Sequence, residues 1–184
     1  MNKLGLRIEK PLSEAMHVKC IRLFLGIGIL TVFVESSNAE GQILLEGRGL
    51  GGLIIGKSKV KDVIGEFGKP DRIETTKVDD SRNYVYSKRG LKFNLHGETL
   101  NTVIALPNFG GKTSRGISLR SSLEDVKATY GYPDVAPGET INNAKVWTYP
   151  DHGVIFWLRR GWLLSRPIGI DRIVIYGRGN SKER

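Results

Sequence analysis

The stretch 58–71, SKVKDVIGEFGKPD, decides the fold because 121–134, SSLEDVKATYGYPD, repeats it sixty-three residues later. Six positions are identical in type without a gap, namely those held in the first stretch by Ser58, Asp62, Val63, Gly68, Pro70 and Asp71. The same offset continues downstream, where Tyr149, Gly153, Phe156 and Leu158 repeat Tyr86, Gly90, Phe93 and Leu95. Self-similarity at a fixed period indicates that one supersecondary unit is used twice.

Each stretch is typical of a short helix with a defined start and end. In the first, Ser58 is a favourable N-cap, and Gly68 followed by Pro70 ends the helix. Its apolar face is predicted from helical spacing to consist of Val60, Val63, Ile64 and Phe67.

The second stretch carries the same signals in a slightly different form. Ser121 and Glu124 have the spacing of a capping box. The matching apolar face is predicted to consist of Leu123, Val126 and Tyr130.

Each helix is followed by alternating apolar and polar residues that indicate antiparallel strands. In the first unit we expect strands at 84–86, 91–95 and 100–106, and in the second at 147–149, 154–158 and 172–176. The fold class is therefore α+β: two tandem repeats, each a short helix or helix pair packed on an antiparallel β-meander, with sheets that can join edge to edge. The repeats are assigned to 57–115 and 116–177, and 178–184 to a disordered tail.

Residues 1–39 are expected to be a signal segment. Lys19 and Arg22 precede an apolar run at 23–34, and small residues follow at 37–39. Met16 is an alternative start, because the charged region before the apolar run is otherwise long. The single cysteine, Cys20, lacks the residues that should precede a lipid-modified cysteine, so no lipid anchor and no disulfide are expected. The mature chain is expected to be periplasmic or secreted, with no transmembrane span.

Residues 40–56 are rich in glycine and are interpreted as a flexible loop that leads into the first repeat. Gly47, Gly49 and Gly52 match the dinucleotide-binding spacing. That motif requires a helix that opens on the glycines, whereas an apolar, strand-like run follows here. No nucleotide site is therefore expected.

The formal net charge is +9, of which residues 1–39 carry +2 (five Lys or Arg against three acidic groups), and the basic groups of the remaining part are scattered through both repeats. A basic surface is compatible with simple solubility, with an acidic protein partner or with an anionic envelope polymer or membrane surface. Nucleic acid is not expected as a partner of an exported chain.

These residues resemble the fold shared by the secreted β-lactamase inhibitory protein, a tandem of two such units, and the SmpA/OmlA outer-membrane assembly lipoproteins, which carry one. The resemblance covers residues 53–176 and rests on a Ser-led helix that ends in Gly-x-Pro-Asp, followed by an aromatic-rich strand and a glycine turn. It implies non-catalytic protein binding in the envelope or outside the cell, through the exposed face of the sheet. The lipid-attachment cysteine and the disulfides of these families are absent here.

No enzyme and no cofactor are expected, and an enzyme of unknown class stays open as a further alternative. His96 and His152 each lie in a turn beside glycine, without a second metal ligand at suitable spacing. No serine occupies a nucleophile elbow. Asp71 and Asp134 recur at equivalent positions, which favours a structural role in turns.

The candidate binding surface is predicted where the two repeats differ. Lys92 and Asn94 are the outward positions of one strand, and their counterparts are Ile155 and Trp157. An eight-residue insertion is expected just beyond, within 159–167. Aromatic residues and arginines are enriched at interface hot spots. The predicted partner-binding residues are Trp147, Ile155, Trp157, Arg159, Arg160 and Trp162.

Two alternative roles for this apolar strand stay open at the level of sequence. Ile155 and Trp157 could pack against the other repeat, the glycine-rich segment or the insertion. Trp162, Leu163 and Leu164, flanked by arginines, could instead contact a membrane surface.

Overall fold

The structure is a computed structural model that describes residues 41–75, 80–161 and 167–178. The predicted signal segment with Cys20, the predicted tail beyond residue 178 and the candidate Trp162 lie outside the described residues.

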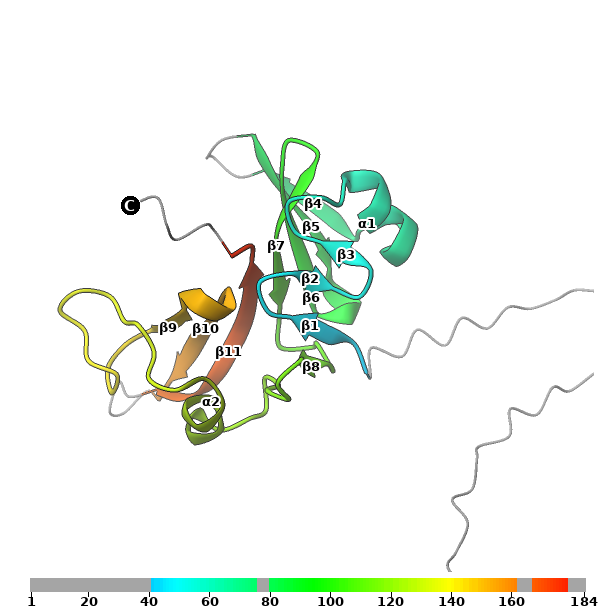
Figure 1. The fold of residues 1–184 in the computed structure, drawn as a ribbon. Coiled ribbons are helices and arrows are strands. Elements are labelled where there is room, and N and C mark those ends of the chain that lie inside the picture. Colours follow the sequence, from blue (N-terminus) through cyan, green and yellow to red (C-terminus); the bar gives the residue numbers. More distant parts are fainter. Residues whose placement is uncertain (1–40, 76–79, 162–166, 179–184) are drawn as a thin grey trace, which may run out of the picture. The chain divides into compact units, whose positions relative to one another are not determined.

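A seven-stranded sheet, in which every neighbouring pair is antiparallel, forms the centre of the described part (Figure 1). Its strand order is β4 (Arg72–Thr75), β5 (Ser81–Tyr86), β6 (Leu91–His96), β7 (Thr99–Ala105), β11 (Pro167–Tyr176), β10 (Val154–Arg160) and β9 (Val146–Tyr149). The pairing of β7 with β11 joins the first half, 57–115, to the second half, 116–177. The predicted joining of the two sheets is thereby confirmed.

Two helices and a small four-stranded sheet complete the fold. The helices are α1 (Val60–Phe67) and α2 (Leu123–Tyr130). The small sheet has the order β3 (Leu53–Ile54), β2 (Gly49–Leu50), β1 (Ile43–Leu45) and β8 (Lys112–Thr113). The mixed α+β class is confirmed.

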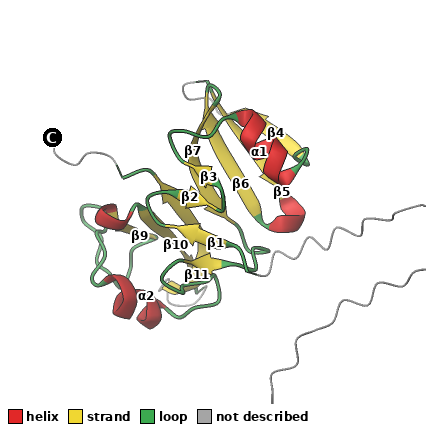
Figure 2. Cartoon of the chain, turned by 45° about the vertical axis from the view of Figure 1, so that its right-hand side comes forward, coloured by secondary structure: helices red, strands yellow, loops and turns green. Residues whose placement is uncertain are grey.

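The helices and the small sheet cover one face of the large sheet, here called the inner face (Figure 2). Phe67 of α1 packs on Tyr86 and Phe93 with ring centroids 5.7 and 4.9 Å apart. Tyr130 of α2 packs in the same way, and its ring centroid lies 5.4 Å from that of Phe156. The inner face is fully buried across the four central strands β6, β7, β11 and β10, at Leu91, Phe93, Val103, Ala105, Val154, Phe156, Ile173 and Ile175.

The two halves correspond at the predicted offset. Both helices and both 3-10 turns, Ser87–Arg89 and Pro150–His152, begin and end sixty-three residues apart. Tyr86 donates its hydroxyl to the carbonyl of Gly68 at 2.8 Å, and Tyr149 donates to the carbonyl of Gly131 at 3.2 Å. Tandem duplication would explain each correspondence, and it stays a prediction.

The strand register corrects the size of the predicted insertion. Phe93 pairs with Val103, and its counterpart Phe156 pairs with Ile173. The offset therefore changes from sixty-three residues in β10 to seventy in β11, so the second hairpin is longer by seven residues, not eight.

The predicted N-caps are wrong by one residue, whereas the predicted helix end at Gly68 is confirmed. The N-cap of α1 is Lys59, whose backbone N–H donates to the Asp62 carboxylate at 2.7 Å. Ser58 instead accepts the backbone N–H of Ile54 at 2.9 Å. In α2 the reciprocal capping box joins Ser122 and Asp125, not Ser121 and Glu124.

Three further expectations are corrected by tertiary contacts. The described part of the glycine-rich segment, 41–56, is not a flexible loop but contributes strands β1 to β3, because Leu44, Leu50 and Leu53 are buried in the core. The segment after Asp71 forms the edge strand β4 and not a second helix. Ile64, expected on the buried face of α1, is 40% exposed.

We expect Gly153→Ala to destabilise the fold more than Gly97→Ala. Both glycines have a positive φ, 66° and 56°, which costs a side chain roughly 1–2 kcal/mol. A Cβ at Gly153 would lie 2.5 Å from the Cα of Gly47 and 2.6 Å from the carbonyl oxygen of Tyr176, whereas Gly97 has open space. Overpacking adds about 1–3 kcal/mol. Urea unfolding of the two variants measures the difference, and equal losses would show that the close approach is unimportant.

Candidate functional site

In the first half, polar side chains on the outer face of the large sheet, opposite the helices, form hydrogen bonds and ion pairs with one another. Glu74 binds Lys92 Nζ at 2.9 Å and Arg72 Nε at 2.8 Å. Hydrogen bonds from Lys92 and Arg72 lower the pKa of the Glu74 carboxyl. Beside this cluster, three side-chain amides are joined by hydrogen bonds in the order Asn83, Asn94 and Asn101.

The outer face of the second half has a different character. Trp157 on β10 is 42% exposed, and Ile155 beside it is half-buried. The Arg172 guanidinium lies over the Trp157 ring, 5.2 Å from its centroid, and Arg172 Nε donates to Asp171 at 3.0 Å. Cross-strand pairing places Arg172 opposite Trp157. This half therefore presents an aromatic ring with a cation held against it.

The structure brings together only part of the predicted binding set. Ile155, Trp157 and Arg159 alternate along β10 on the outer face, and Trp157 and Arg159 are exposed. Arg160 lies beyond a register shift and is half-buried. Trp147 is a correction, because it is 2% exposed and its indole N–H donates to the carbonyl of Ile141 at 3.3 Å.

Sequence reasoning missed three neighbours of Trp157. Val146 on β9 and Arg172 on β11 flank it, and Val174 pairs with Ile155. The available signal was the alternation of β11, which places Arg172 and Val174 on one face. Their position beside Trp157 depends on a register that the sequence does not specify. We call Val146, Ile155, Trp157, Arg159, Arg172 and Val174 the Trp157 face.

A pocket of about 550 Å³ lies next to this face and was also missed. Arg159 belongs to both. The other lining residues come from the loop before α2 and from the start of β11: Pro107, Leu119, Arg120, Ser121, Ser122, Ile168, Gly169, Ile170 and Asp171.

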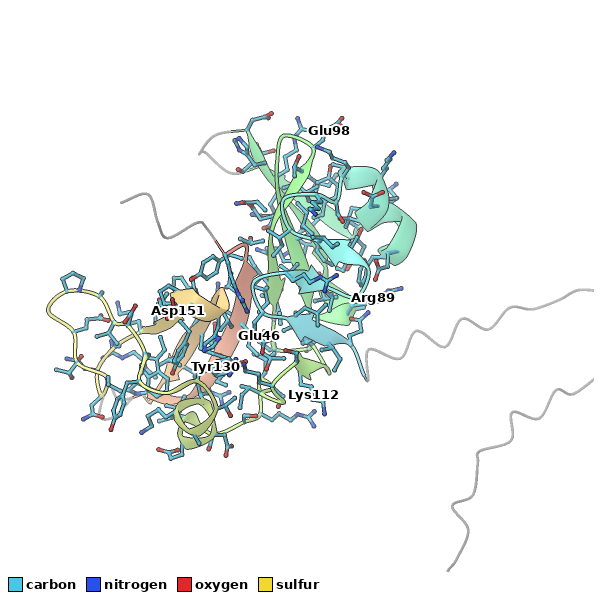
Figure 3. All side chains as sticks on the ribbon, in the orientation of Figure 1. Glu46, Arg89, Glu98, Lys112, Tyr130 and Asp151 are labelled. Atoms are coloured by element: carbon cyan, nitrogen blue, oxygen red, sulfur yellow. The ribbon has the colours of Figure 1, made fainter. Side chains whose placement is uncertain are left out.

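A buried polar network joins the small sheet to α2 and lies away from the predicted residues. Figure 3 shows Glu46, which follows β1, beside Tyr130 at the end of α2. The Tyr130 hydroxyl donates to Glu46 Oε1 at 2.5 Å, and the Ser114 hydroxyl donates to the other carboxylate oxygen. Thr113 Oγ1 lies 2.8 Å from the Tyr130 oxygen. The buried carboxylate is thus surrounded by donors.

The pKa values in this network follow from burial and hydrogen bonding. Burial alone raises the pKa of Glu46, but hydrogen bonds from Ser114, Tyr130 and the Arg115 backbone outweigh it, so this pKa lies below its ordinary value. Burial and the neighbouring Glu46 charge raise the pKa of Tyr130. Burial, together with the charge of Arg115, lowers the pKa of His152. A charged Glu46 with a neutral Tyr130 is the arrangement expected of a structural link.

The described residues bear on two other kinds of site. They contain no group of three or more His, Cys, Asp or Glu side chains that could hold a metal ion. No helix in this part of the chain is long and apolar enough to cross a membrane.

Comparison with known proteins gives similarity at the level of solved structures only, since no protein-family model and no curated protein matches the chain. A DUF4309 family protein from Bacillus subtilis is 16% identical with a TM-score of 0.44, over 71% of this chain and 88% of that one. A cysteine-rich secretory protein from Staphylococcus aureus is 14% identical with a TM-score of 0.39, over 77% of this chain and 49% of that one. The chain thus spans about half of the staphylococcal protein. The resemblance to the β-lactamase inhibitory protein and the SmpA/OmlA group stays a prediction.

We expect Glu46→Gln to flatten the acid side of the stability profile. The folded-state pKa of Glu46 is lowered, so its contribution is present above the ordinary value of 4.5 and is lost as pH falls through the folded-state pKa. The glutamine variant should therefore be less stable at neutral pH and lose less stability on acidification. Chemical unfolding at a series of pH values measures both effects.

Glu74→Gln is the matched control, since the pKa of Glu74 is also lowered but near the surface, by half-buried Lys92 and exposed Arg72. At about 1 M NaCl, where the Debye length is about 3 Å, the Glu74 effect should shrink while the buried Glu46 effect persists. An unchanged acid slope in Glu46→Gln would contradict this assignment.

Proposed function

We propose that the chain is an exported, non-enzymatic protein-binding module whose binding surface is the Trp157 face. The observation that carries the proposal is the contrast within one sheet face. In the first half the polar side chains bind one another, as Glu74 does with Lys92. In the second half an aromatic ring and apolar side chains take the corresponding positions. Export rests on the predicted signal segment, and the resemblance to inhibitory and assembly proteins implies the same use of a sheet face.

The Trp157 face has the composition of an interface centre. Tryptophan and arginine are over-represented among hot spots because they combine large buried area with directional hydrogen bonds. Trp157 is 42% exposed, so a partner can remove further apolar surface from water. Val146 and Val174 are only half-buried and extend the apolar surface on either side of β10.

The charge around Trp157 indicates the chemistry of the partner. Arg172 covers one side of the ring, and Arg159 is exposed two residues farther along β10. The chain as a whole carries a formal net charge of +9. Complementary charge steers association and suppresses wrong partners, so we assign the face to a protein surface with an apolar centre and acidic residues around it.

The double variant Ile155→Lys, Trp157→Asn should bind this partner at least about 30-fold more weakly, which is the scale of a hot-spot loss. It gives the second half the residues that the first half carries as Lys92 and Asn94, where they are folded on the same kind of strand. A fold that tolerates them once should tolerate them again. Affinity capture from envelope extract identifies candidates, and the Kd of each purified candidate is then measured with both proteins.

Ile64→Lys is the control, because Ile64 is 40% exposed on α1 and its replacement changes charge and apolar area elsewhere. The proposal requires tight binding by wild type and Ile64→Lys and loss in the double variant. Equal Kd values for all three would overturn it. Binding only to anionic vesicles or polymer, with a steep loss on adding salt, would also overturn it in favour of a charged-surface binder.

A further inference from the structure

The pocket beside the Trp157 face combines apolar walls with cationic groups. Leu119, Ile168 and Ile170 line it together with Arg120 and Arg159. Its volume of about 550 Å³ falls within the roughly 300–1,000 Å³ typical of ligand pockets. It is therefore suited to part of a larger molecule and not to a single small ion.

The two arginines are available to a ligand. Within the described residues neither the Arg120 nor the Arg159 guanidinium has an ion-pair or hydrogen-bond partner. The one acidic residue in the lining, Asp171, is instead bound by Arg172 at 3.0 Å. Guanidinium groups favour planar, bidentate recognition of carboxylates.

Arg159 is positioned by the absence of a neighbouring side chain. A Cβ on Gly169 would lie 3.1 Å from Arg159 Nη2, so the guanidinium packs on the bare backbone of β11. Gly169 pairs with Arg159 across the two strands. The pocket wall thereby orients this guanidinium.

Two hydroxyl groups add donors. Ser122 Oγ accepts the backbone N–H of Asp125 at 3.0 Å, and Ser121 Oγ accepts the backbone N–H of Ser118 at 3.0 Å. Accepting these bonds leaves each hydroxyl proton for donation. Ser121 has a further contact of 3.5 Å with Ser118 Oγ, which is a weak alternative.

We propose that this pocket binds a carboxylate together with the apolar residue next to it, presented by an acidic segment of the protein partner. The inference rests on the proposed function, since Arg159 makes the pocket continuous with the Trp157 face. The nearby Asp171 carboxylate favours a singly charged carboxylate over a phosphate dianion. Leu119 and Ile168 supply contact for the apolar residue.

The test is an NMR titration of the full chain with the singly charged peptide acetyl-Gly-Leu-Leu-Asp-amide, compared with its neutral form acetyl-Gly-Leu-Leu-Asn-amide. We expect saturable shifts at Ser121, Gly169 and the Nε–H groups of Arg120 and Arg159 with the acidic peptide only. Arg120→Gln should weaken binding at least about tenfold, the scale of one charge-assisted contact. Gly169→Ala should weaken it several-fold without changing the charge, because it displaces Arg159.

Arg48→Gln is the control, because Arg48 is exposed and does not line the pocket, so the affinity of the peptide should not change. Equal binding of the neutral peptide, tighter binding of inorganic phosphate, or no effect of Arg120→Gln would overturn the assignment.

The same variants separate this inference from the proposed function. If Ile155→Lys, Trp157→Asn abolishes partner binding while Arg120→Gln preserves it, the carboxylate pocket fails and the Trp157 face stands. If the acidic peptide binds through Arg120 but the double variant binds every partner normally, the Trp157 face fails and the pocket stands.

Discussion

The antiparallel pairing of β7 with β11 is the interaction on which the rest of the structure depends. It turns two meanders into one sheet and removes two open edges, which would otherwise be sites for unwanted pairing. Val103 pairs with Ile175 and Ala105 with Ile173, while the internal offset makes Val103 the counterpart of Ile173 and Ala105 that of Ile175. The contact is thus self-complementary, as a two-fold interface between identical subunits is. It also places the polar and apolar outer faces side by side.

On the inner face the two halves share the same aromatic packing but differ in one hydrogen-bonding group. Phe67 and Tyr130 occupy equivalent helix ends and both pack on the sheet aromatics. Only Tyr130 carries a hydroxyl, and that hydroxyl donates to Glu46 of the small-sheet segment. One oxygen atom therefore ties the N-terminal strands to the second half. A guanidinium lies over the ring in both halves, Arg89 over Phe67 at 5.3 Å and Arg115 over Tyr130 at 5.5 Å, so the hydroxyl is what differs.

Local signals in the sequence predicted much of the fold, and contacts between distant residues account for what they missed. The α+β class and the major strands followed from periodicity and from the glycine and proline stops. The N-caps were wrong because adjacent residues compete: Ser121 binds Ser118 while Ser122 caps the helix. Strands β1 and β2 are too short to be recognised and exist because Leu44 and Leu50 enter the core, and only β3 lies in a run that looked strand-like. Part of the candidate site could likewise be named from the sequence. Ile155, Trp157 and Arg159 lie in a recognisable strand and differ from their counterparts in the first half. Residue type alone could not show that Trp147 is buried while Trp157 is exposed. The strand register shows it, because Trp147 pairs with the core residue Phe156. The pocket gathers residues from 107 to 171 and has no local signature.

One cross-strand pair on the outer face differs between the two halves in both of its members. Asn94 lies opposite Thr102 in the first half, and the equivalent pair in the second half is Trp157 opposite Arg172. Both members of the cross-strand pair differ, and the new members contact each other as cation and ring. A lone exposed tryptophan would only add apolar surface. A tryptophan held by Arg172, itself bound to Asp171, is fixed before a partner arrives, so less side-chain entropy is lost on association. The paired difference therefore supports the proposed binding role of the Trp157 face, which a lone exposed tryptophan would support less.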